Sequence, residues 1–492
     1  MKSLIDRTSI AGLIFAFFAF FALSFSTSTA RMGGADEVLH HATAWYDTSH
    51  LVVTKEYNSV QKDIPLKVAV WPCFIFQIEK PSSCSLTKLP DEMGEMVVYN
   101  YFPLYYYFVG VGDRIGLAFF SYYAWLGGRL LAMLPVMIIM FLFLRRVGSS
   151  LNKFAAFLPL LIFTPEFISL VGTANPNGFE IMTSLWFLIV LYDYLRGSDR
   201  TLWKLLLAEF LLIASRPMGV FWVLAIFSLV SIYGFYASGK STLILERSKK
   251  EFMRLASTLL KLIPLLSGGL IWVLTHPLDV TMPPMIRPKG FTPAASFSFE
   301  TFPSFFLNSL ALIPKRLNES YFMAGYKEIF SPWFLSVAIG LSVIYLIILS
   351  NKTFRNYIFT ILLFIVFFVT MSLIEAQNWG KWPEFWLGRY QLPILIPMLF
   401  ILLKDLVLSK KWVVLFIINL FVFGSIYSAY ENFARYQVGI VNGIPNSFFL
   451  PSDLLGYLSY SLIACMTICG LLITVKTNKL IKNNWRIIDE KY

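Results

Sequence analysis

Long apolar runs separated by short polar segments dominate the order of residues along this 492-residue chain. A run of about 20 apolar residues is long enough to cross a bilayer as a helix. The pattern therefore predicts an all-α integral membrane protein with about 12 transmembrane helices. These helices are expected near residues 8–29, 119–144, 154–172, 179–195, 202–214, 219–236, 256–275, 332–350, 356–374, 390–403, 412–430 and 455–475. Further membrane-embedded segments are expected near residues 101–112 and 302–314.

The first apolar run follows Lys2 and Arg7 and is longer than the core of a secretory signal peptide. Thr29-Ala30-Arg31 is only a weak candidate for a cleavage site. We therefore interpret the run as an uncleaved first helix, with a cleaved signal peptide as the alternative.

Lysine and arginine residues give the helices an orientation. With the N-terminus in the cytoplasm, the majority of basic residues lie in cytoplasmic connections, as the positive-inside rule requires. Residues 1–475 then form one transmembrane domain, and residues 476–492 form a basic cytoplasmic tail. The extracytoplasmic face carries two long loops, 30–118 and 276–331, and the first of them is expected to contain juxtamembrane helices. The basic stretch 237–261 is amphipathic and is expected to lie on the cytoplasmic leaflet.

Composition supports the membrane assignment. The chain is 57% hydrophobic and 14% charged, whereas soluble domains carry about 25% charged residues. The net charge of +12 is distributed between apolar runs, so it indicates membrane topology rather than nucleic-acid binding. No internal repeat of fixed period is visible, which weakens an inverted-repeat transporter as an interpretation.

A compact group of titratable residues follows the first helix. Asp36 and Glu37 come directly after Gly33-Gly34, at the expected start of a second helix, and His40 and His41 follow within one turn. Carboxylates and histidines at this spacing share helix faces and can act as acids, bases or metal ligands. An ordinary helix cap with two exposed histidines is the alternative. A divalent cation (Mg²⁺, Mn²⁺ or Ca²⁺) could bind the two carboxylates, but no cofactor is required by the sequence.

Three arginines are candidates for binding an anion. Arg129 lies inside a spanning segment, where a charge is costly and either functional or paired with another helix. Arg216 breaks the chain between two helices, and Arg389 precedes a later helix in a segment that could instead be an interfacial anchor. Guanidinium groups at such positions suit a phosphate. Asn175 and Asn177, at a tight turn, could hydrogen-bond a polar ligand.

Aromatic residues and cysteines add two further expectations. Tyr105 and Trp382 lie in aromatic-rich segments that suit a membrane-interface belt, and also suit contacts to a sugar or a lipid chain. Cys73 and Cys84 share one extracytoplasmic segment, which predicts a disulfide, with two free thiols as the alternative. Nucleotide-binding and hydrolase motifs such as the P-loop, the dinucleotide fingerprint and Gly-x-Ser-x-Gly do not occur.

Several of these motifs, in this order, resemble a large bacterial family of membrane proteins of unknown function that is grouped with the GT-C glycosyltransferases. Ala35 stands where the family pattern has proline, and Leu387 stands where it has glutamine; neither change touches a charged group. The matching motifs are Ala35-Asp36-Glu37-Val38-Leu39-His40, Cys73 with Cys84, Phe102-Pro103-Leu104-Tyr105-Tyr106, Leu126-Gly127-Gly128-Arg129-Leu130, Asn175-Pro176-Asn177-Gly178, Ser215-Arg216-Pro217 and Leu387-Gly388-Arg389-Tyr390-Gln391-Leu392-Pro393.

The resemblance implies an inverting membrane glycosyltransferase that takes a sugar from a polyprenyl-phosphate donor, on the extracytoplasmic face of the bacterial cytoplasmic membrane. Its partners would be the lipid-linked donor, an envelope glycan or glycolipid acceptor and membrane lipids, with no nucleic acid. Asp36 or Glu37 would be the base that activates the acceptor. Arg129, Arg216 and Arg389 would bind the phosphate, and His40, His41, Asn175, Asn177, Tyr105 and Trp382 would contact substrate.

Two other functions fit the same pattern. A flippase or transporter of a lipid-linked glycan should carry charged residues along a path through several helices. An O-antigen-type ligase or polymerase would use arginines in a large outer loop, and Lys315-Arg316 in the 276–331 loop keeps that possibility open.

Overall fold

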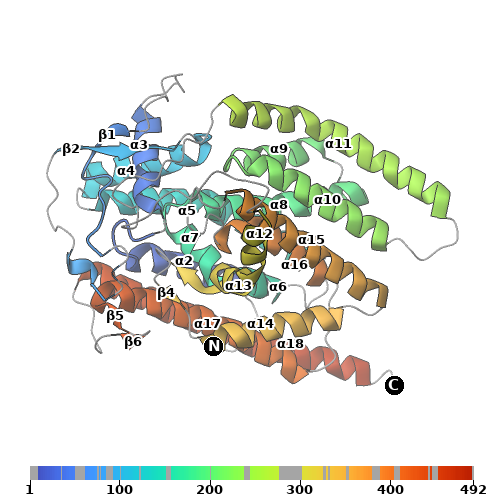
Figure 1. The fold of residues 1–492 in the computed structure, drawn as a ribbon. Coiled ribbons are helices and arrows are strands. Elements are labelled where there is room, and N and C mark those ends of the chain that lie inside the picture. The colour runs from blue at the N-terminus through green and yellow to red at the C-terminus, as the bar shows by residue number, and fades with distance from the viewer. Residues whose placement is uncertain are drawn as a thin grey trace.

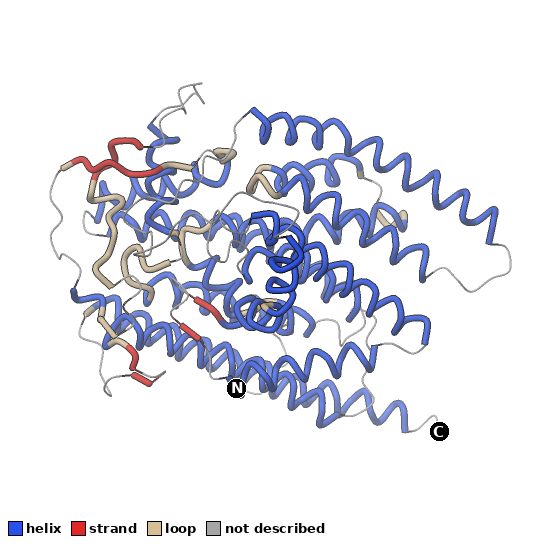
Figure 2. Tube along the Cα trace, viewed as in Figure 1, coloured by secondary structure: helices blue, strands red, loops and turns tan. Residues whose placement is uncertain are grey.

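The structure, a computed structural model, describes much of the chain, including the predicted site apart from Trp382. Helices account for most of the fold, and loops and short two-stranded sheets make up the rest (Figure 2). The residues described are 9–34, 36–49, 61–74, 77, 79–84, 92–99, 101–120, 123–150, 157–199, 201–237, 244–275, 302–324, 329–330, 333–350, 354–378, 388–403, 411–441, 444–445 and 453–489.

The first part of the chain pairs a long apolar helix with a polar subdomain. The expected helices in the 30–118 segment are present as α3 and α4, and strands β1 and β2 pair antiparallel beside α3. A single turn of 3₁₀ helix, η1, lies between the two strands in sequence. The elements are α2 (Ile10–Ser28), α3 (Glu37–Ser49), β1 (Gln61–Pro65), η1 (Ser82–Cys84), β2 (Met93–Val97), α4 (Leu104–Phe120) and α5 (Ala124–Ser150).

The expected single helix over residues 154–172 is wrong within the described part of that segment. Two short helices, α6 (Leu158–Ile162) and α7 (Pro165–Gly172), replace it. Pro165 cannot donate a backbone hydrogen bond to the preceding turn, and the Thr164 side chain accepts from the Phe167 amide, so a new helix starts there.

The middle of the chain continues with long helices. Gly197 ends α8 in the left-handed conformation that favours glycine. From Ile244 on, the basic stretch expected on the membrane surface continues without a break into the following apolar run, and the two form one helix, α11. The elements are α8 (Pro176–Arg196), α9 (Leu202–Ile213), α10 (Gly219–Ala237) and α11 (Ile244–Thr275).

The last part of the chain contains short helices, two small hairpins and the long helices α14, α15, α17 and α18. Helix α18 runs through the expected boundary at residue 475, so the described part of the basic tail is helical. The elements are α12 (Phe302–Ala311), α13 (Ile313–Phe322), β3 (Met323–Ala324), β4 (Ile329–Phe330), α14 (Trp333–Ser350), α15 (Phe354–Asn378), η5 (Gly388–Gln391), α16 (Leu392–Leu403), α17 (Lys411–Val438), β5 (Ile440–Val441), β6 (Ile444–Pro445) and α18 (Leu454–Asp489).

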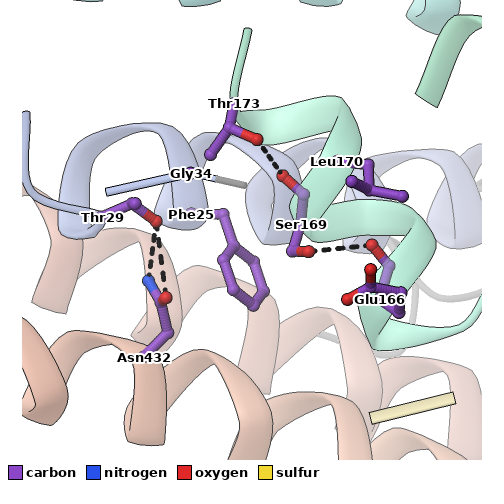
Figure 3. A pocket seen from close by; sticks show the side chains of 8 residues that line it. All are labelled: Phe25, Thr29, Gly34, Glu166, Ser169, Leu170, Thr173 and Asn432. Carbon is purple, nitrogen blue, oxygen red and sulfur yellow. Dashed lines mark hydrogen bonds between the residues drawn. The ribbon is translucent and has the colours of Figure 1, made fainter. Parts of the chain in front are cut away.

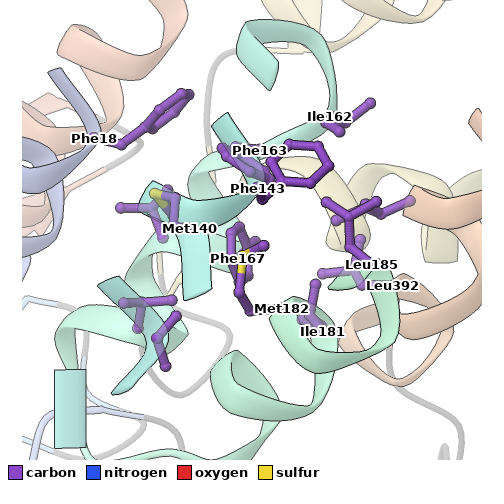
Figure 4. Packing of buried hydrophobic residues seen from close by; sticks show 14 of the residues in the cluster. Phe18, Met140, Phe143, Ile162, Phe163, Phe167, Ile181, Met182, Leu185 and Leu392 are labelled. Atoms are coloured by element: carbon purple, nitrogen blue, oxygen red, sulfur yellow. The ribbon is translucent and has the colours of Figure 1, made fainter. Parts of the chain in front are cut away.

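Side chains from many of the helices meet in one apolar core. Phe18 of α2, Phe143 of α5, Phe167 of α7 and Leu392 of α16 are all buried there (Figure 4). Helix α2, the first in sequence, packs against both α5 and α18, so it is central to the bundle. The core therefore fixes the end of α2, from which the candidate site begins.

Outward-facing side chains are apolar as well. On α11, Phe252, Leu260, Ile271 and Leu274 are exposed, although exposed apolar surface of this extent is unfavourable in water. Among the described residues, five helices are long and apolar enough to cross a membrane, and four shorter apolar helices accompany them. The five are Ile10–Ser28, Ala124–Val147, Pro176–Arg196, Phe252–Thr275 and Leu454–Lys479, and the shorter ones are Gly219–Tyr233, Val337–Ile348, Thr360–Leu373 and Arg389–Leu403. The prediction of a helical membrane protein is thus confirmed.

The two ends of the bundle differ. Helix α3 and the hairpins β1–β2 and β5–β6 gather at one end, whereas the end of α10, the start of α11 and the end of α18 lie at the opposite end (Figure 1). Helices α12 and α13, from the expected 276–331 loop, lie near the middle of this view, whereas the elements of the expected 30–118 loop are together at one end. The candidate site lies near these elements.

Candidate functional site

The turn between α2 and α3 separates the two predicted carboxylates. Asp36 has a φ of 56°, a left-handed conformation that aspartate tolerates better than most side chains. Glu37 begins α3, and its Oε2 accepts a hydrogen bond of 2.9 Å from the Gly34 amide. The side chain of Asp36 is 37% exposed, whereas that of Glu37 is completely buried. Of the pair, only Asp36 is open to a substrate.

Arg129 holds Glu37 in place. Its Nε donates to Glu37 Oε1 at 2.5 Å and its Nη2 donates to Oε2 at 2.7 Å. Its remaining N–H groups donate to the carbonyl oxygens of Ser26, Thr29 and Ala30, at the end of α2. All five guanidinium donors are therefore engaged. This geometry favours a positioning role for Arg129 over direct contact with a phosphate.

His41 extends this ion pair into a buried network. Its Nδ1 is 2.8 Å from Asp113 Oδ1, and its Nε2 is 3.6 Å from Glu37 Oε1. Burial alone would lower the pKa of His41, but Asp113 and Glu37 raise it to about 9. Burial likewise raises the pKa of Glu37, yet Arg129 and His41 together hold it well below its usual range. Two cations and two carboxylates thus balance one another, so this network anchors α3 to α4 and α5.

Glycines allow the network to form. Gly128 lies against Asp113 and His41, so closely that a β-carbon at position 128 would overlap both side chains. Gly112 and Gly127 face each other across α4 and α5, with no space for a side chain on either. The Gly-Gly-Arg motif therefore combines a close helix contact with the buried arginine.

His40 faces the opposite side, among tyrosines. Its Nδ1 is 3.0 Å from the Tyr106 hydroxyl, and its ring lies 5.3 Å from that of Tyr99. Tyr99 stacks on Tyr101 with ring centroids 4.9 Å apart. Burial lowers the pKa of His40 well below its usual value, and the charges of Arg216 and Arg389 lower it further. His40 is therefore neutral at physiological pH.

Arg389 and Arg216 both lie close to one aromatic ring, that of Tyr390. Each guanidinium carbon is 5.2 Å from the centre of the Tyr390 ring. Arg389 Nη2 donates to Asp36 Oδ2 at 2.5 Å, and its buried Nε has no hydrogen-bond partner among the described residues. The predicted arginine at position 389 thus meets the exposed carboxylate of the predicted pair.

Arg216 is held by neighbours on α8 and in the segment before α4. It donates to Asn177 Oδ1, lies 3.5 Å from Glu180 Oε2 and contacts the Tyr101 hydroxyl at 3.3 Å. Its buried Nε likewise lacks a partner among the described residues. Asn177 therefore positions an arginine. We refer to Asp36, His40, Tyr99, Tyr101, Arg216, Arg389 and Tyr390 together as the Asp36 cluster.

An apolar slot reaches Arg216 from the helix bundle. This cavity, of about 220 Å³, lies between α9, α11 and the segment after α9. Arg216 is the single charged residue on its wall, and Phe102, Phe210 and Trp272 supply aromatic surface. A narrow apolar space ending at a guanidinium group suits an amphiphile with an anionic head.

Several predicted residues have other surroundings. Tyr105 is buried against Phe179, with ring centroids 6.0 Å apart, so it belongs to the core. Asn175 caps α8 by accepting from the Asn177 amide. Trp382 lies outside the described residues. The disulfide between Cys73 and Cys84 is confirmed.

The residues that sequence reasoning missed are mostly acids in apolar stretches. Asp113 holds His41, Glu180 faces Arg216, and Glu166 is buried on α7. A charged residue in an apolar run was the available signal, since such residues are seldom placed there without a role. Arg435 was also missed; it donates to three carbonyl oxygens of the disulfide loop, those of Phe74, Gln77 and Lys80.

The donor set does not suit a divalent cation. Asp36 and Glu37 are each paired with an arginine, and they do not share a site. Within the described ranges, no group of three or more histidine, cysteine, aspartate or glutamate side chains could hold a metal ion. Mg²⁺ and Ca²⁺ are bound by several oxygen ligands together, so the two carboxylates do not provide a chelating pair.

Fold and site define a multi-pass helical membrane protein with a charged, aromatic cluster near one end of its bundle. The model of a family described as "Predicted membrane protein (DUF2142)" matches residues 17–399, and the chain belongs to that family. The matched region contains the second half of α2 and every residue of the Asp36 cluster. Neither the curated proteins nor the solved structures that were compared give a match.

Proposed function

We propose that this protein is a membrane glycosyltransferase that transfers a sugar from a polyprenyl-phosphate donor to an envelope glycan or lipid acceptor. The observation that carries the proposal is the contact between Asp36, a partly exposed carboxylate, and Arg389, a buried guanidinium whose Nε has no hydrogen-bond partner in the described part of the chain. Base and phosphate ligand are thus adjacent, as displacement at a sugar phosphate requires.

Arg389 couples donor binding to activation of the base. A donor phosphate that binds Arg389 competes with Asp36 for the same guanidinium. Once it loses this ion pair, the Asp36 carboxylate can accept a hydrogen bond from the acceptor hydroxyl instead. Donor binding would therefore release Asp36 for its role as the base.

The reaction balances as a single displacement. Asp36 takes the proton of the acceptor hydroxyl, whose oxygen forms a bond to the anomeric carbon. The bond between that carbon and the phosphate oxygen breaks, and the electron pair leaves with the polyprenyl phosphate. Arg389 and Arg216 stabilise the charge that develops on this leaving group. Inversion at the anomeric carbon follows from one displacement.

Arg216 and the apolar slot support a lipid as the carrier. The donor phosphate would sit between Arg216 and Arg389, beside Tyr390, and its first isoprene units would enter the slot lined by Phe102, Phe210 and Trp272. Stacked Tyr99 and Tyr101 offer a face for the sugar. His40, neutral and bonded to Tyr106, offers a neutral hydrogen-bonding group.

Charge placement favours the enzyme over the alternatives. A flippase needs a polar path, but Arg129 is enclosed by its partners. The ligase reading relied on Lys315-Arg316, and Arg316 is buried and paired with Glu319 at 3.0 Å. The proposal also retains the finer topology: about 12 spans, a GT-C-like arrangement, both termini in the cytoplasm of a bacterium and the Asp36 cluster on the extracytoplasmic face.

Asp36→Asn tests the proposal. The purified protein is supplied with radiolabelled polyprenyl-phosphate sugars and candidate acceptors. We expect transfer by the variant to fall by about 10²–10⁴-fold, the usual contribution of a general base. Glu37→Gln should instead reduce the yield of folded protein, because it removes a charge from the buried network.

Asp193→Asn is the matched control. Asp193 is also paired with an arginine, Arg146 at 2.8 Å, but lies at the end of α8, outside the site. It should keep wild-type transfer. Full transfer by a folded Asp36→Asn variant would refute the catalytic assignment, and donor translocation without transfer would favour the flippase.

A further inference from the structure

A small chamber lies behind the Asp36 turn. It has a volume of about 10 Å³, enough for one particle about as large as a water molecule. Thr29 and Gly34 line it from the end of α2 and the following turn, Glu166, Ser169 and Thr173 from α7 and its cap, and Asn432 from α17 (Figure 3). Phe25 forms an apolar wall. The chamber is separate from the slot and the Asp36 cluster.

Hydrogen-bond donors on the chamber wall already donate to other protein groups. The Gly34 amide donates to Glu37 at 2.9 Å, the Ser169 hydroxyl to the Glu166 carbonyl at 2.8 Å and the Thr173 hydroxyl to the Ser169 carbonyl at 2.9 Å. The Asn432 amide group donates to the hydroxyls of Ser28 and Thr29, at 2.7 and 3.0 Å. A hydroxyl has one proton and two lone pairs, so oxygen acceptors remain. The wall therefore favours a positively charged occupant.

Glu166 adds a buried carboxyl group to this wall. Its side chain is 2% exposed, its carboxylate points into the chamber in Figure 3, and its Oε2 has no hydrogen-bond partner among the described residues. The positive charge acting on Glu166 is that of Arg389, which is already paired with Asp36, and the negative charge of Glu319 opposes it. A buried carboxylate without its own counter-charge is costly, so a cation or a proton must balance it.

We propose that the chamber binds one dehydrated monovalent cation of about the size of sodium. A hard cation prefers oxygen ligands, and the wall offers a carboxylate together with hydroxyl and amide oxygens. One carboxylate matches a single positive charge. Mg²⁺ keeps several waters, for which the chamber has no room. Potassium is larger than sodium and fits less well.

Such a cation would join three elements behind the site. Glu166 and Thr173 belong to α7 and its cap, Asn432 to α17, and Gly34 lies two residues before Asp36. Binding would therefore stabilise the native arrangement of α2, α7 and α17. This inference does not depend on glycosyl transfer, so it can fail or succeed independently of the proposed function.

Thermal unfolding of the full-length protein in detergent tests the site. Unfolding midpoints are measured in NaCl, KCl and choline chloride at equal ionic strength, over a range of concentrations. A ligand that binds only the native state raises the midpoint with its concentration. We expect a sodium-dependent rise that exceeds the potassium effect and is absent in choline. Equilibrium binding of ²²Na⁺ should show one saturable site per chain.

Variants identify the ligand group. Glu166→Gln keeps the shape of the side chain and removes its charge, so it should abolish both the sodium shift and ²²Na⁺ binding. Glu209→Gln is the matched control: Glu209 is also buried, with both oxygens unpartnered among the described residues, but lies on α9 away from the chamber. If Glu166→Gln does not fold, Thr173→Val replaces one oxygen at constant volume and should weaken sodium binding by about tenfold.

Three results would overturn the proposal. The first is equal midpoints in all three salts. The second is a sodium shift that Glu166→Gln retains. The third is stabilisation that follows pH alone, which would mean that a proton rather than a metal ion balances Glu166.

Discussion

Asp36 and Glu37 are neighbours in sequence but have opposite surroundings. Glu37 points into the protein, where Arg129 donates a hydrogen bond to each of its carboxylate oxygens. Asp36 is partly exposed beside Arg389. The left-handed backbone at Asp36 produces this difference, because it turns the chain just before α3 begins. Removing Arg129 would leave a buried carboxylate unpaired, a change that typically costs about 3–5 kcal/mol.

His41 makes stability depend on pH. Its pKa in the folded protein, about 9, exceeds its usual value of 6.5, because Asp113 and Glu37 favour the charged ring. The stabilisation is complete below about pH 6.5 and is lost as the pH rises through about 9. At about 1.4 kcal/mol per pKa unit it amounts to at most about 3.5 kcal/mol. We expect the unfolding midpoint of the wild type to fall between pH 7 and pH 10.

Asp113→Asn should flatten this profile, because His41 then loses its nearest negative charge. The control is Asp193→Asn, which should keep the wild-type profile. A wild-type midpoint that rises or stays level between pH 7 and pH 10 would show that His41 is not held as a cation.

At the scale of elements, the sequence predicts the long helices well. The first apolar run, expected at 8–29, is α2 (Ile10–Ser28), and the positions of α3 and α4 within the first loop were anticipated. The break at Thr164-Pro165 was missed, although a capping threonine before a proline is a local signal. Apolar content alone does not distinguish one helix from two short ones that turn within the core.

Contacts between distant segments could not be predicted from spacing. The sequence marked Asp36, Arg216 and Arg389 separately, but Asp36 and Arg389 meet across more than 350 residues of chain. Partner choice depends on how α3, η5 and the segment after α9 pack together. Arg129 illustrates the same limit: its burial was expected, but its pairing with Glu37 and the end of α2 comes from packing.

The slot between α9 and α11 provides a prediction at this scale. Gly268 lines the slot, and a β-carbon there would have no atom within 4 Å, so a side chain can be added without overlap. Gly268→Phe should fill part of the slot and raise the KM for a polyprenyl-phosphate sugar at least about tenfold, because the lipid chain loses its buried apolar contact. Initial-rate kinetics over a range of donor concentrations measure this effect.

Gly340→Phe on α14 is the control, since a β-carbon there is also free of contacts and the residue does not line the slot. It should leave the KM unchanged. An equal KM for Gly268→Phe and the wild type would mean that the donor chain lies elsewhere, while Asp36 could still be the base.

At the scale of the whole molecule, hydrogen bonds connect the disulfide loop to the candidate site. The disulfide loop docks on α17 through Arg435, and the Ser82 hydroxyl donates to the Tyr436 carbonyl. Tyr436 in turn donates to the Gly33 carbonyl at 2.8 Å, which connects the disulfide loop to the turn that carries Asp36. A disulfide close to the site suits an oxidising compartment, and this agrees with the extracytoplasmic placement in the proposal.

Cysteine labelling of intact cells tests that placement. In a background with Cys465 and Cys469 replaced by serine, Met93→Cys introduces a thiol on β2, where Met93 is 58% exposed. Ser198→Cys introduces a thiol at an exposed position just after α8, which is one of the candidate membrane spans. A membrane-impermeant maleimide should label position 93 in intact cells and position 198 only after permeabilisation. The reverse pattern would place Asp36 and Arg389 on the cytoplasmic side, where a donor presented on the outer leaflet could not reach them. Labelling of both positions in intact cells would show that the membrane does not separate position 93 from position 198.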